Sequence, residues 1–328
     1  MPQHEFDSIL LVAFGGPTPG CCHKYDSCPG EAFCFVEGIV GNAPSKADRV
    51  KEVADHYTRI GGFSPFNELT TKQAEALQAA LAEKDVDVPV YTGFRHWSPY
   101  VREVIPRMVN DGHRDILAII MAPHQSKVSW DWYQQTVAEA VENLEGEKPA
   151  VNYLSPWFRY EGFITAVVER IREECKDLSP AEFDKAALVF TAHGIPQSAA
   201  RTSSYTRQFR RSAGLAAKKL GRDVFELAYQ SAPTNPPVPW TQPDINALIR
   251  ERLRKRVDTI IASPIGFLCD HVEVLYDLDY EACATADRYG LNFIRAGTVG
   301  THPDFINMLA DHCCDEVHTE HPTDHPTE

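Results

Sequence analysis

The chain has 328 residues, 43% of them hydrophobic, which is enough for two ordinary domains with a substantial core. Lys and Arg total 32 against 46 Asp and Glu, and the formal net charge of −14 argues against nucleic acid as a partner. The N-terminal MPQHEFDSILLVAFGG contains only a strand-length apolar run, so we expect neither a signal peptide nor a membrane span. Nine cysteines, with adjacent pairs at 21–22 and 313–314, suit a reducing compartment, and we expect the protein in the cytoplasm.

Strands and helices are predicted to alternate along the chain. Eight apolar, β-rich runs predict strands, and their ranges are 8–14, 88–94, 115–122, 150–154, 186–192, 224–230, 258–263 and 292–297. Helix-like segments separate these runs, and continuous apolar strands between helices are typical of parallel sheets covered on both faces. The pattern therefore predicts the α/β class with doubly wound sheets, divided into two four-stranded halves.

The break between the halves is expected near 145–150, where EGEKPA interrupts a helix with charge, glycine and proline. That helix carries apolar and aromatic residues at core-facing spacing, namely Trp130, Tyr133, Val137, Val141 and Leu144. We therefore expect one domain over 1–149 and a second over 150–310. The remainder, 311–328, has six acids, four histidines and no Lys or Arg, and its far end is expected to be a solvated tail.

Residues that can carry chemistry follow the predicted strands directly. In an open parallel sheet the ligand crevice lies beyond the carboxyl ends of the strands. Those ends lead into FGGP (14–17), RHWSP (95–99), PHQS (123–126), HGIP (193–196), QSAP (230–233) and PIGFLCDHVE (264–273). No G-x-G-x-x-G or G-x-x-x-x-G-K-[ST] motif follows any of these strands. A rim of glycine, proline, histidine and carboxylate therefore predicts a metal-handling cleft and not a nucleotide pocket.

Four carboxylates late in the chain form the most informative pattern. Asp270, Glu273, Asp277 and Glu281 fall at helical spacing and crowd onto one stripe of a predicted helix. Four like charges on one face repel one another, so the stripe either receives a cation or protons or is a solvated acidic face. His193, at the exit of another strand, supplies an imidazole, and imidazole with carboxylate suits a borderline ion such as Fe²⁺. We therefore single out the pair of His193 and Glu273.

Several segments resemble the signature motifs of the ferrochelatase family. The most specific are TAHGIP, YQSAPTNPPVPWTQPD and PIGFLCDHVEVLYDLDYE, at 191–196, 229–244 and 264–281. Three earlier segments, HYTRIGGFSPFNELTTKQAEAL, YTGFRHWSP and MAPHQSKVSWDWY, resemble the family in the same order and spacing. The resemblance implies a type II chelatase-like fold, with two Rossmann-like domains and a cleft between them. It also implies insertion of Fe²⁺ into a porphyrin in haem biosynthesis, with no ATP or redox cofactor.

The resemblance also implies roles for individual residues. His193 and Glu273 match the facing histidine and glutamate of the family's metal-insertion site, where a base must remove two pyrrole protons. The family's positions on a proton or metal path are matched by Asp270, His271, Asp277 and Glu281. Contacts to the porphyrin, which the family is thought to bind puckered, are matched by Phe14, Tyr57, Ser64, Arg95, His96 and Tyr133. Arg95 is expected to pair with a substrate propionate.

The chain departs from the family pattern near the substrate. Phe14 stands where coproporphyrin-using ferrochelatases of Gram-positive bacteria tend to carry a tyrosine able to ligate iron. His56 precedes Tyr57 where an arginine is common, and Val40 stands where an arginine can contact substrate. The segment 41–55 lacks the long apolar lip associated with membrane-facing protoporphyrin enzymes. The missing lip favours the more polar substrate coproporphyrin III, and the choice between coproporphyrin III and protoporphyrin IX stays open.

A cysteine-rich insertion is expected at 20–34. Its thiols, Cys21, Cys22, Cys28 and Cys34, are the number that a [2Fe–2S] cluster or a zinc site requires, although their spacing is not a standard pair of C-x-x-C motifs. Cluster-bearing ferrochelatases combine C-terminal cysteines with one from mid-chain, and that middle position is Ala166 here. We therefore expect either a cluster or zinc ion held by the insertion or four thiols that hold no metal.

Two alternatives to iron insertion stay open. One is a haem or porphyrin carrier that has kept the cleft and lost turnover. The other is a cobalt or nickel chelatase acting on another tetrapyrrole, against which the QSAP and PW segments argue. The expected partners are a porphyrin and Fe²⁺, and the chain is expected to be a monomer or a weak homodimer.

Overall fold

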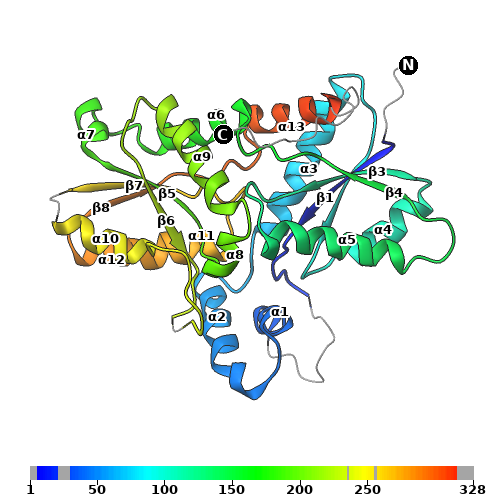
Figure 1. The fold of residues 1–328 in the computed structure, drawn as a ribbon, viewed down its shortest axis with the longest axis horizontal. Coiled ribbons are helices and arrows are strands. Elements are labelled where there is room, and N and C mark those ends of the chain that lie inside the picture. The colour runs from blue at the N-terminus through cyan, green and yellow to red at the C-terminus, as the bar shows by residue number, and fades with distance from the viewer. Residues whose placement is uncertain (1–5, 21–29, 235, 255–256, 316–328) are drawn as a thin grey trace.

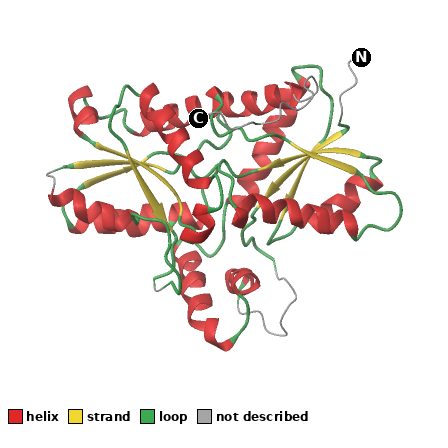
Figure 2. Cartoon of the chain, in the orientation of Figure 1, coloured by secondary structure: helices red, strands yellow, loops and turns green. Residues whose placement is uncertain are grey.

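Two four-stranded sheets lie side by side, and helices cover both faces of each sheet (Figure 1, Figure 2). This arrangement comes from a computed structural model that describes residues 6–20, 30–234, 236–254 and 257–315. The strand order is β2-β1-β3-β4 in the first sheet and β6-β5-β7-β8 in the second, and all of these neighbours are parallel. The predicted α/β class, with two four-stranded parallel sheets flanked by helices, is confirmed.

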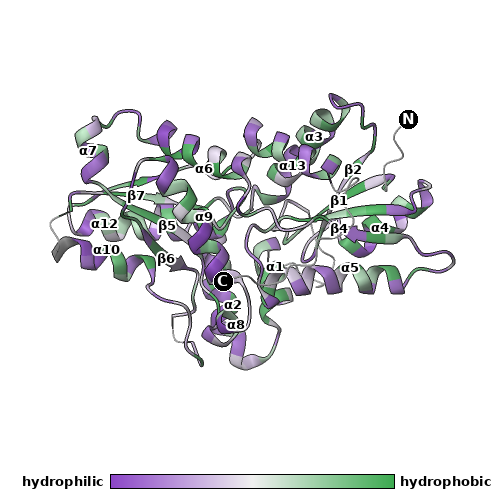
Figure 3. Cartoon of the chain, turned by 45° about the horizontal axis from the view of Figure 1, so that its top comes forward, coloured by the Kyte–Doolittle hydropathy of each residue, from purple (hydrophilic) through white to green (hydrophobic). Residues whose placement is uncertain are grey.

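The strands coincide with the predicted runs to within two residues at each end. They are β1 (Ser8–Ala13), β2 (Val90–Phe94), β3 (Asp115–Ile120), β4 (Ala150–Tyr153), β5 (Ala187–His193), β6 (Glu226–Gln230), β7 (Thr259–Ser263) and β8 (Asn292–Arg295). Every residue of β1 is buried, because helices pack on both faces of a parallel strand. Figure 3 shows mostly apolar residues along the strands and both hydrophilic and apolar residues along the helices.

Helices connect the strands within each half. Those of the first half are α1 (Glu31–Val40), the 3₁₀ turn η1 (Pro44–Lys46), α2 (Ala47–Arg59), α3 (Phe66–Ala82), α4 (Val101–Asn110), the π-helical η2 (Lys127–Asp131) and α5 (Trp132–Glu142). Those of the second half are α6 (Glu161–Glu174), α7 (Pro180–Lys185), α8 (Gln197–Arg201), α9 (Tyr205–Lys219), α10 (Ile245–Arg254), α11 (Val272–Leu275), the π-helical η3 (Asp277–Ala282), α12 (Cys283–Arg288) and α13 (Pro303–Asp315).

The crossing between the halves lies later than expected. β4 pairs with β3, so residues 150–153 belong to the first sheet, and a break at 149/150 would separate two hydrogen-bonded strands. The charged segment before β4 is the loop between a helix and its following strand, which is why its composition resembled that of a linker. The chain passes to the second sheet after Tyr153.

The last helix joins the two halves. α13 packs against both α6 of the second half and α3 of the first. Trp157 lies at the centre of this junction, with its ring 5.2 Å from that of Phe163 and 5.4 Å from that of Phe305. Residues 311–315, expected to open the tail, instead end α13 and bury Cys313; residues 316–328 are outside the described ranges.

A search of the described helices finds none that is both long enough and apolar enough to cross a membrane.

Candidate active site

His193 and Glu273 lie within ion-pair distance of each other. His193 is the last residue of β5, and Glu273 lies in the first turn of α11. The Nε2 atom of His193 is 3.3 Å from the Oε1 atom of Glu273. Their side chains are 34% and 28% exposed, so both remain reachable from solvent. The fold thus brings together the two residues that the sequence analysis paired across 80 positions of the chain.

The pair carries opposite charges at neutral pH. Burial lowers the pKa of His193, but the Glu273 carboxylate more than offsets this effect and raises the pKa to about 9. Burial raises the pKa of Glu273, and the His193 imidazolium outweighs it and brings the pKa to about 2. An imidazolium and a carboxylate therefore face each other, and an arriving cation must displace the proton of His193 before the imidazole can act as a ligand.

The acidic segment is not one regular helix. α11 ends after one turn, the π-helix η3 follows, and α12 resumes the α-helical geometry. Asp270 precedes α11, and the Nδ1 atom of His271 accepts a hydrogen bond of 3.2 Å from the Glu273 amide and so caps the helix. The predicted single stripe of four carboxylates is therefore wrong, because Asp270 lies outside the helix and the π-helical turn changes the spacing.

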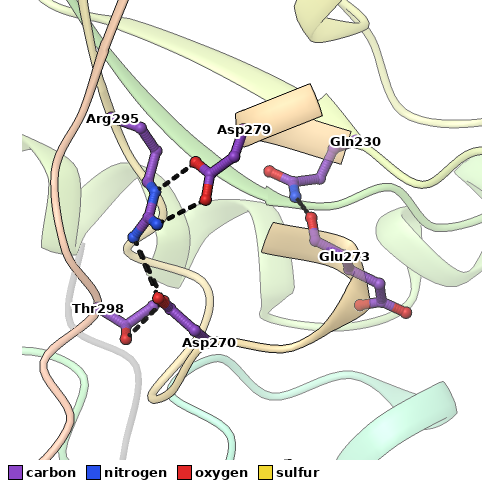
Figure 4. A network of polar contacts seen from close by, with 6 residues as sticks. All are labelled: Gln230, Asp270, Glu273, Asp279, Arg295 and Thr298. Carbon is purple, nitrogen blue, oxygen red and sulfur yellow. Dashed lines mark hydrogen bonds and ion pairs between the residues drawn. The ribbon is translucent and has the colours of Figure 1, made fainter. Parts of the chain in front are cut away.

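Asp270 belongs to a separate network, as Figure 4 shows. The Arg295 guanidinium lies 3.3 Å from the Asp270 carboxylate and makes two hydrogen bonds of 2.7 Å to Asp279. Thr298 donates a further hydrogen bond of 3.0 Å to Asp270. The Glu273 carboxylate points away from this network in Figure 4. Arg295 is thus shared between Asp279 and Asp270, and the expected place of Asp270 on the proton or metal path stays a prediction.

Asp277 and Glu281 continue from Glu273 along the π-helical segment. Asp277 is buried and accepts a hydrogen bond from the Ser231 hydroxyl. Burial, reinforced by the nearby Glu273 carboxylate, raises the pKa of Asp277 to about 8. Glu281 accepts a hydrogen bond of 3.2 Å from the Asn246 amide, and burial also raises its pKa. This succession suits proton transfer away from Glu273, since Asp277 titrates close to neutral pH.

Aromatic side chains of the first half pack close to this acidic segment. The Phe14 ring lies 4.6 Å from the His96 ring and 6.2 Å from the Phe35 ring, which in turn lies 5.8 Å from Tyr57. Val272, the neighbour of Glu273, packs in the same cluster as Phe35 and Tyr57. The predicted residues Phe14, Tyr57 and His96 therefore form one aromatic wall that reaches the start of α11.

The other predicted substrate contacts have different surroundings. Arg95 lies over the Trp132 ring at 4.6 Å and lines a cavity of about 290 Å³ bounded by α4 and α5. Tyr133 is buried, and burial raises its pKa. Ser64 is buried beside Gly16, and a Cβ atom added to Gly16 would lie 2.6 Å from the Cβ atom of Ser64. Ser64 therefore packs against the loop after β1, and its expected contact with the porphyrin stays a prediction.

Sequence reasoning missed part of the aromatic wall. Phe35 lies on α1 (EAFCFVEGIV), directly after the segment 20–34 that was interpreted as a cysteine-rich insertion, and the apolar residues of α1 at helical spacing were the signal for a helix. Trp97 packs against Phe35 at 5.9 Å. From the other side, Tyr276 stacks on His56 of α2 with ring centroids 3.8 Å apart. No local pattern marks such a pair, because its partners are 220 residues apart in the chain.

The described residues contain no group of three or more His, Cys, Asp or Glu that could hold a metal ion. A transient metal substrate is compatible with this finding, because a macrocycle supplies further nitrogen ligands. Cys21, Cys22 and Cys28 lie outside the described residues, and Cys34 is buried in α1. The last four residues of the expected insertion, 31–34, are thus helical and not part of a loop.

A model of the ferrochelatase family matches residues 34–317. The chain belongs to the ferrochelatase family. Among curated proteins, the coproporphyrin III ferrochelatase of Streptomyces coelicolor is 35% identical and is aligned over 93% of this chain and 84% of its own. The ferrochelatase of Thermus thermophilus is 36% identical over 93% of this chain and 97% of its own. The resemblance inferred from the motifs is therefore confirmed.

Solved structures support the fold of this ferrochelatase. A structure of SirB from Bacillus subtilis with Fe³⁺ has a TM-score of 0.59 at 12% identity, and covers 95% of each chain. The sirohydrochlorin chelatase SirB in complex with cobalt, from Bacillus subtilis subspecies spizizenii, has a TM-score of 0.55 at 13% identity over 94% of each chain. At this identity the likeness concerns architecture only, and it confirms the chelatase-like fold.

Proposed function

We propose that this ferrochelatase inserts Fe²⁺ into coproporphyrin III and releases two protons. The observation that carries the proposal is the His193–Glu273 pair, with its atoms 3.3 Å apart and both side chains partly exposed beside an aromatic wall. Imidazole and carboxylate are suitable ligands for Fe²⁺, and the same groups accept protons. Membership of a family with coproporphyrin III ferrochelatases among its members supports this substrate.

In the proposed reaction the protein supplies ligands, bases and a surface for the macrocycle. Fe²⁺ displaces the proton of His193 and is held by His193 and Glu273 until the porphyrin nitrogens take it over. The pyrrole protons pass to these groups and leave by Asp277 and Glu281, of which Asp277 titrates nearest to neutral pH. Phe14 and His96, the partly exposed members of the aromatic wall, hold the porphyrin face by packing, and the phenyl ring of Phe14 offers no ligand to iron.

Anaerobic addition of Fe²⁺ to the purified protein with either coproporphyrin III or protoporphyrin IX tests the proposal. The expected result is loss of the free-porphyrin spectrum, faster with coproporphyrin III. His193→Ala and Glu273→Ala are expected to lower kcat by about a hundredfold or more, the usual contribution of a positioned acid or base. His302→Ala, in the loop before α13, is the matched control with expected normal turnover.

The outcomes separate the proposal from its rivals. Insertion of Co²⁺ or Ni²⁺ into another tetrapyrrole, without insertion of Fe²⁺ into either porphyrin, would favour a different chelatase. Tight binding of the metallated product without turnover would favour a carrier. Equal turnover of His193→Ala and the wild type would contradict the proposed site.

The cysteine-rich segment forms a second part of the proposal. Cys21, Cys22, Cys28 and Cys34 provide four thiolates, the donor set that suits a [2Fe–2S] cluster or a zinc ion. Visible spectra with iron, zinc and acid-labile sulfide analysis of the purified protein distinguish a cluster, a zinc ion and thiols that hold no metal. The cysteine usage also underlies the proposed cytoplasmic location, and the monomer or weak dimer stays a prediction for sedimentation analysis.

A further inference from the structure

The backbone carbonyls of both paired residues are held by buried side-chain donors. The Tyr205 hydroxyl donates a hydrogen bond of 2.8 Å to the carbonyl oxygen of His193. The Gln230 amide donates to the carbonyl oxygen of Glu273, and Figure 4 shows this contact with the Glu273 carboxylate directed away from it. Tyr205 is 7% exposed and Gln230 is 1% exposed. Both donors are therefore buried and hold the backbone of His193 and Glu273 by hydrogen bonds.

Gln230 connects the two segments that carry the pair. It is the last residue of β6 and stands opposite His193 in the parallel register of β5 and β6. Its own carbonyl accepts a hydrogen bond of 2.7 Å from the amide of Gly194, while its side chain holds Glu273. One buried residue therefore sets the spacing between the exit of β5 and the start of α11.

Tyr205 is fixed on a rigid element that also contacts the first half. It begins α9, and its ring lies 6.0 Å from the ring of His124 in the loop after β3. The neighbouring Gln208 of α9 accepts a hydrogen bond of 2.7 Å from the Gln125 amide in that loop. α9 therefore links the His193 carbonyl, at the end of a strand in the second sheet, to the loop after β3 in the first half.

Small displacements of these backbone segments would separate the paired side chains. The ion pair measures 3.3 Å, so a shift of about 1 Å takes it beyond ordinary contact, and misplacement on this scale is costly in active sites. We infer that Tyr205 and Gln230 are positioning residues for metal insertion, and this inference rests on the proposed function. They act through the His193 and Glu273 backbone and do not themselves touch the reacting atoms.

Removal of each donor tests the inference. Tyr205→Phe deletes one hydroxyl, and Gln230→Met deletes the amide donor while keeping the length of the side chain. Each variant is expected to lower kcat roughly twofold to tenfold, the effect of one net hydrogen bond, while the KM for porphyrin stays within about twofold. The split between kcat and KM is the readout, because the porphyrin surface is untouched.

Tyr153→Phe is the matched control. The Tyr153 hydroxyl also donates to a backbone carbonyl, that of Gln134, at 3.4 Å in the first half. Comparable unfolding midpoints for Tyr153→Phe and Tyr205→Phe, with kcat lowered only in the latter, would support positioning. Unchanged kcat in both Tyr205→Phe and Gln230→Met, or equal loss of kcat in the control, would overturn it. A wild-type protein that inserts no iron would instead refute the proposed function, and this inference with it.

Discussion

Replacement of Glu273 by glutamine is expected to lower the pKa of His193 from about 9 towards its ordinary value of 6.5. The Glu273 carboxylate is the main group that raises this pKa, and after its removal burial, which disfavours the charged imidazolium, is opposed only by the Gly194 carbonyl and Asp277. A fall from about 9 to 6.5 corresponds to about 3 kcal/mol between the two protonation states. Because the side chains of the pair keep 34% and 28% exposure, solvent screening reduces its contribution to stability to about 1–2 kcal/mol.

The pH dependence of that contribution has a defined direction. The raised pKa of His193 means that its stabilising effect is complete below pH 6.5 and is lost as the pH rises through about 9. The lowered pKa of Glu273 means that its effect is present above pH 4.5 and is lost as the pH falls through about 2. The free energy of unfolding should therefore differ most between wild type and Glu273→Gln from pH 4.5 to 6.5.

Histidine-selective NMR titration measures the pKa directly, with the His193 signal assigned from its loss in His193→Asn. Asp304→Asn is the control, since Asp304 faces another histidine, His302, at 3.6 Å in a remote ion pair. This control is expected to leave the His193 titration unchanged. A pKa for His193 that stays near 9 in Glu273→Gln would refute the assignment of Glu273 as the group that holds its proton.

Three further predictions concern residues around the pair. Asp270→Asn is expected to keep kcat for iron insertion within about threefold of wild type, because the Asp270 carboxylate is paired with Arg295; a hundredfold loss would support a place for Asp270 on the proton path. Because the pKa of Asp277 is raised to about 8 from 3.8, the free energy of unfolding of the wild type falls as the pH rises between these values. The fall between pH 5 and pH 8, measured by urea unfolding, should be smaller in Asp277→Asn. Gly266→Ala should lower the free energy of unfolding by about 1–3 kcal/mol, since its Cβ would lie 2.7 Å from the Cα of Ala192; an unchanged melting temperature would contradict this.

The strands could be predicted because their pattern is local. β1, β3 and β5 are continuous apolar runs, and helices on both faces of a parallel sheet require that pattern. The domain break was harder to place, because the loop before β4 has the composition of a linker. Only the pairing of β4 with β3 assigns that strand to the first sheet.

The candidate site was predictable in part. The motifs singled out His193 and Glu273, and the β5 and α11 segments carry them to within 3.3 Å. Helical periodicity placed Asp270 with them, because a helix was assumed to include residue 270, whereas α11 begins at Val272 and leaves Asp270 outside it. Arg295, which pairs with Asp270, comes from β8, and no pattern within 264–281 indicates it.

The amino-acid sequence by itself determined the fold class, the strand set, the family and the identity of the central imidazole and carboxylate, because apolar periodicity and motif spacing are properties of short segments. Only the tertiary structure decided which partners and which pKa values the charged site residues have. Arg295 pairs with Asp270, burial raises the pKa of Asp277 to about 8, and Tyr205 and Gln230 hold the backbone of the pair. These effects depend on distances between atoms that are far apart in the chain, and such distances are set by packing.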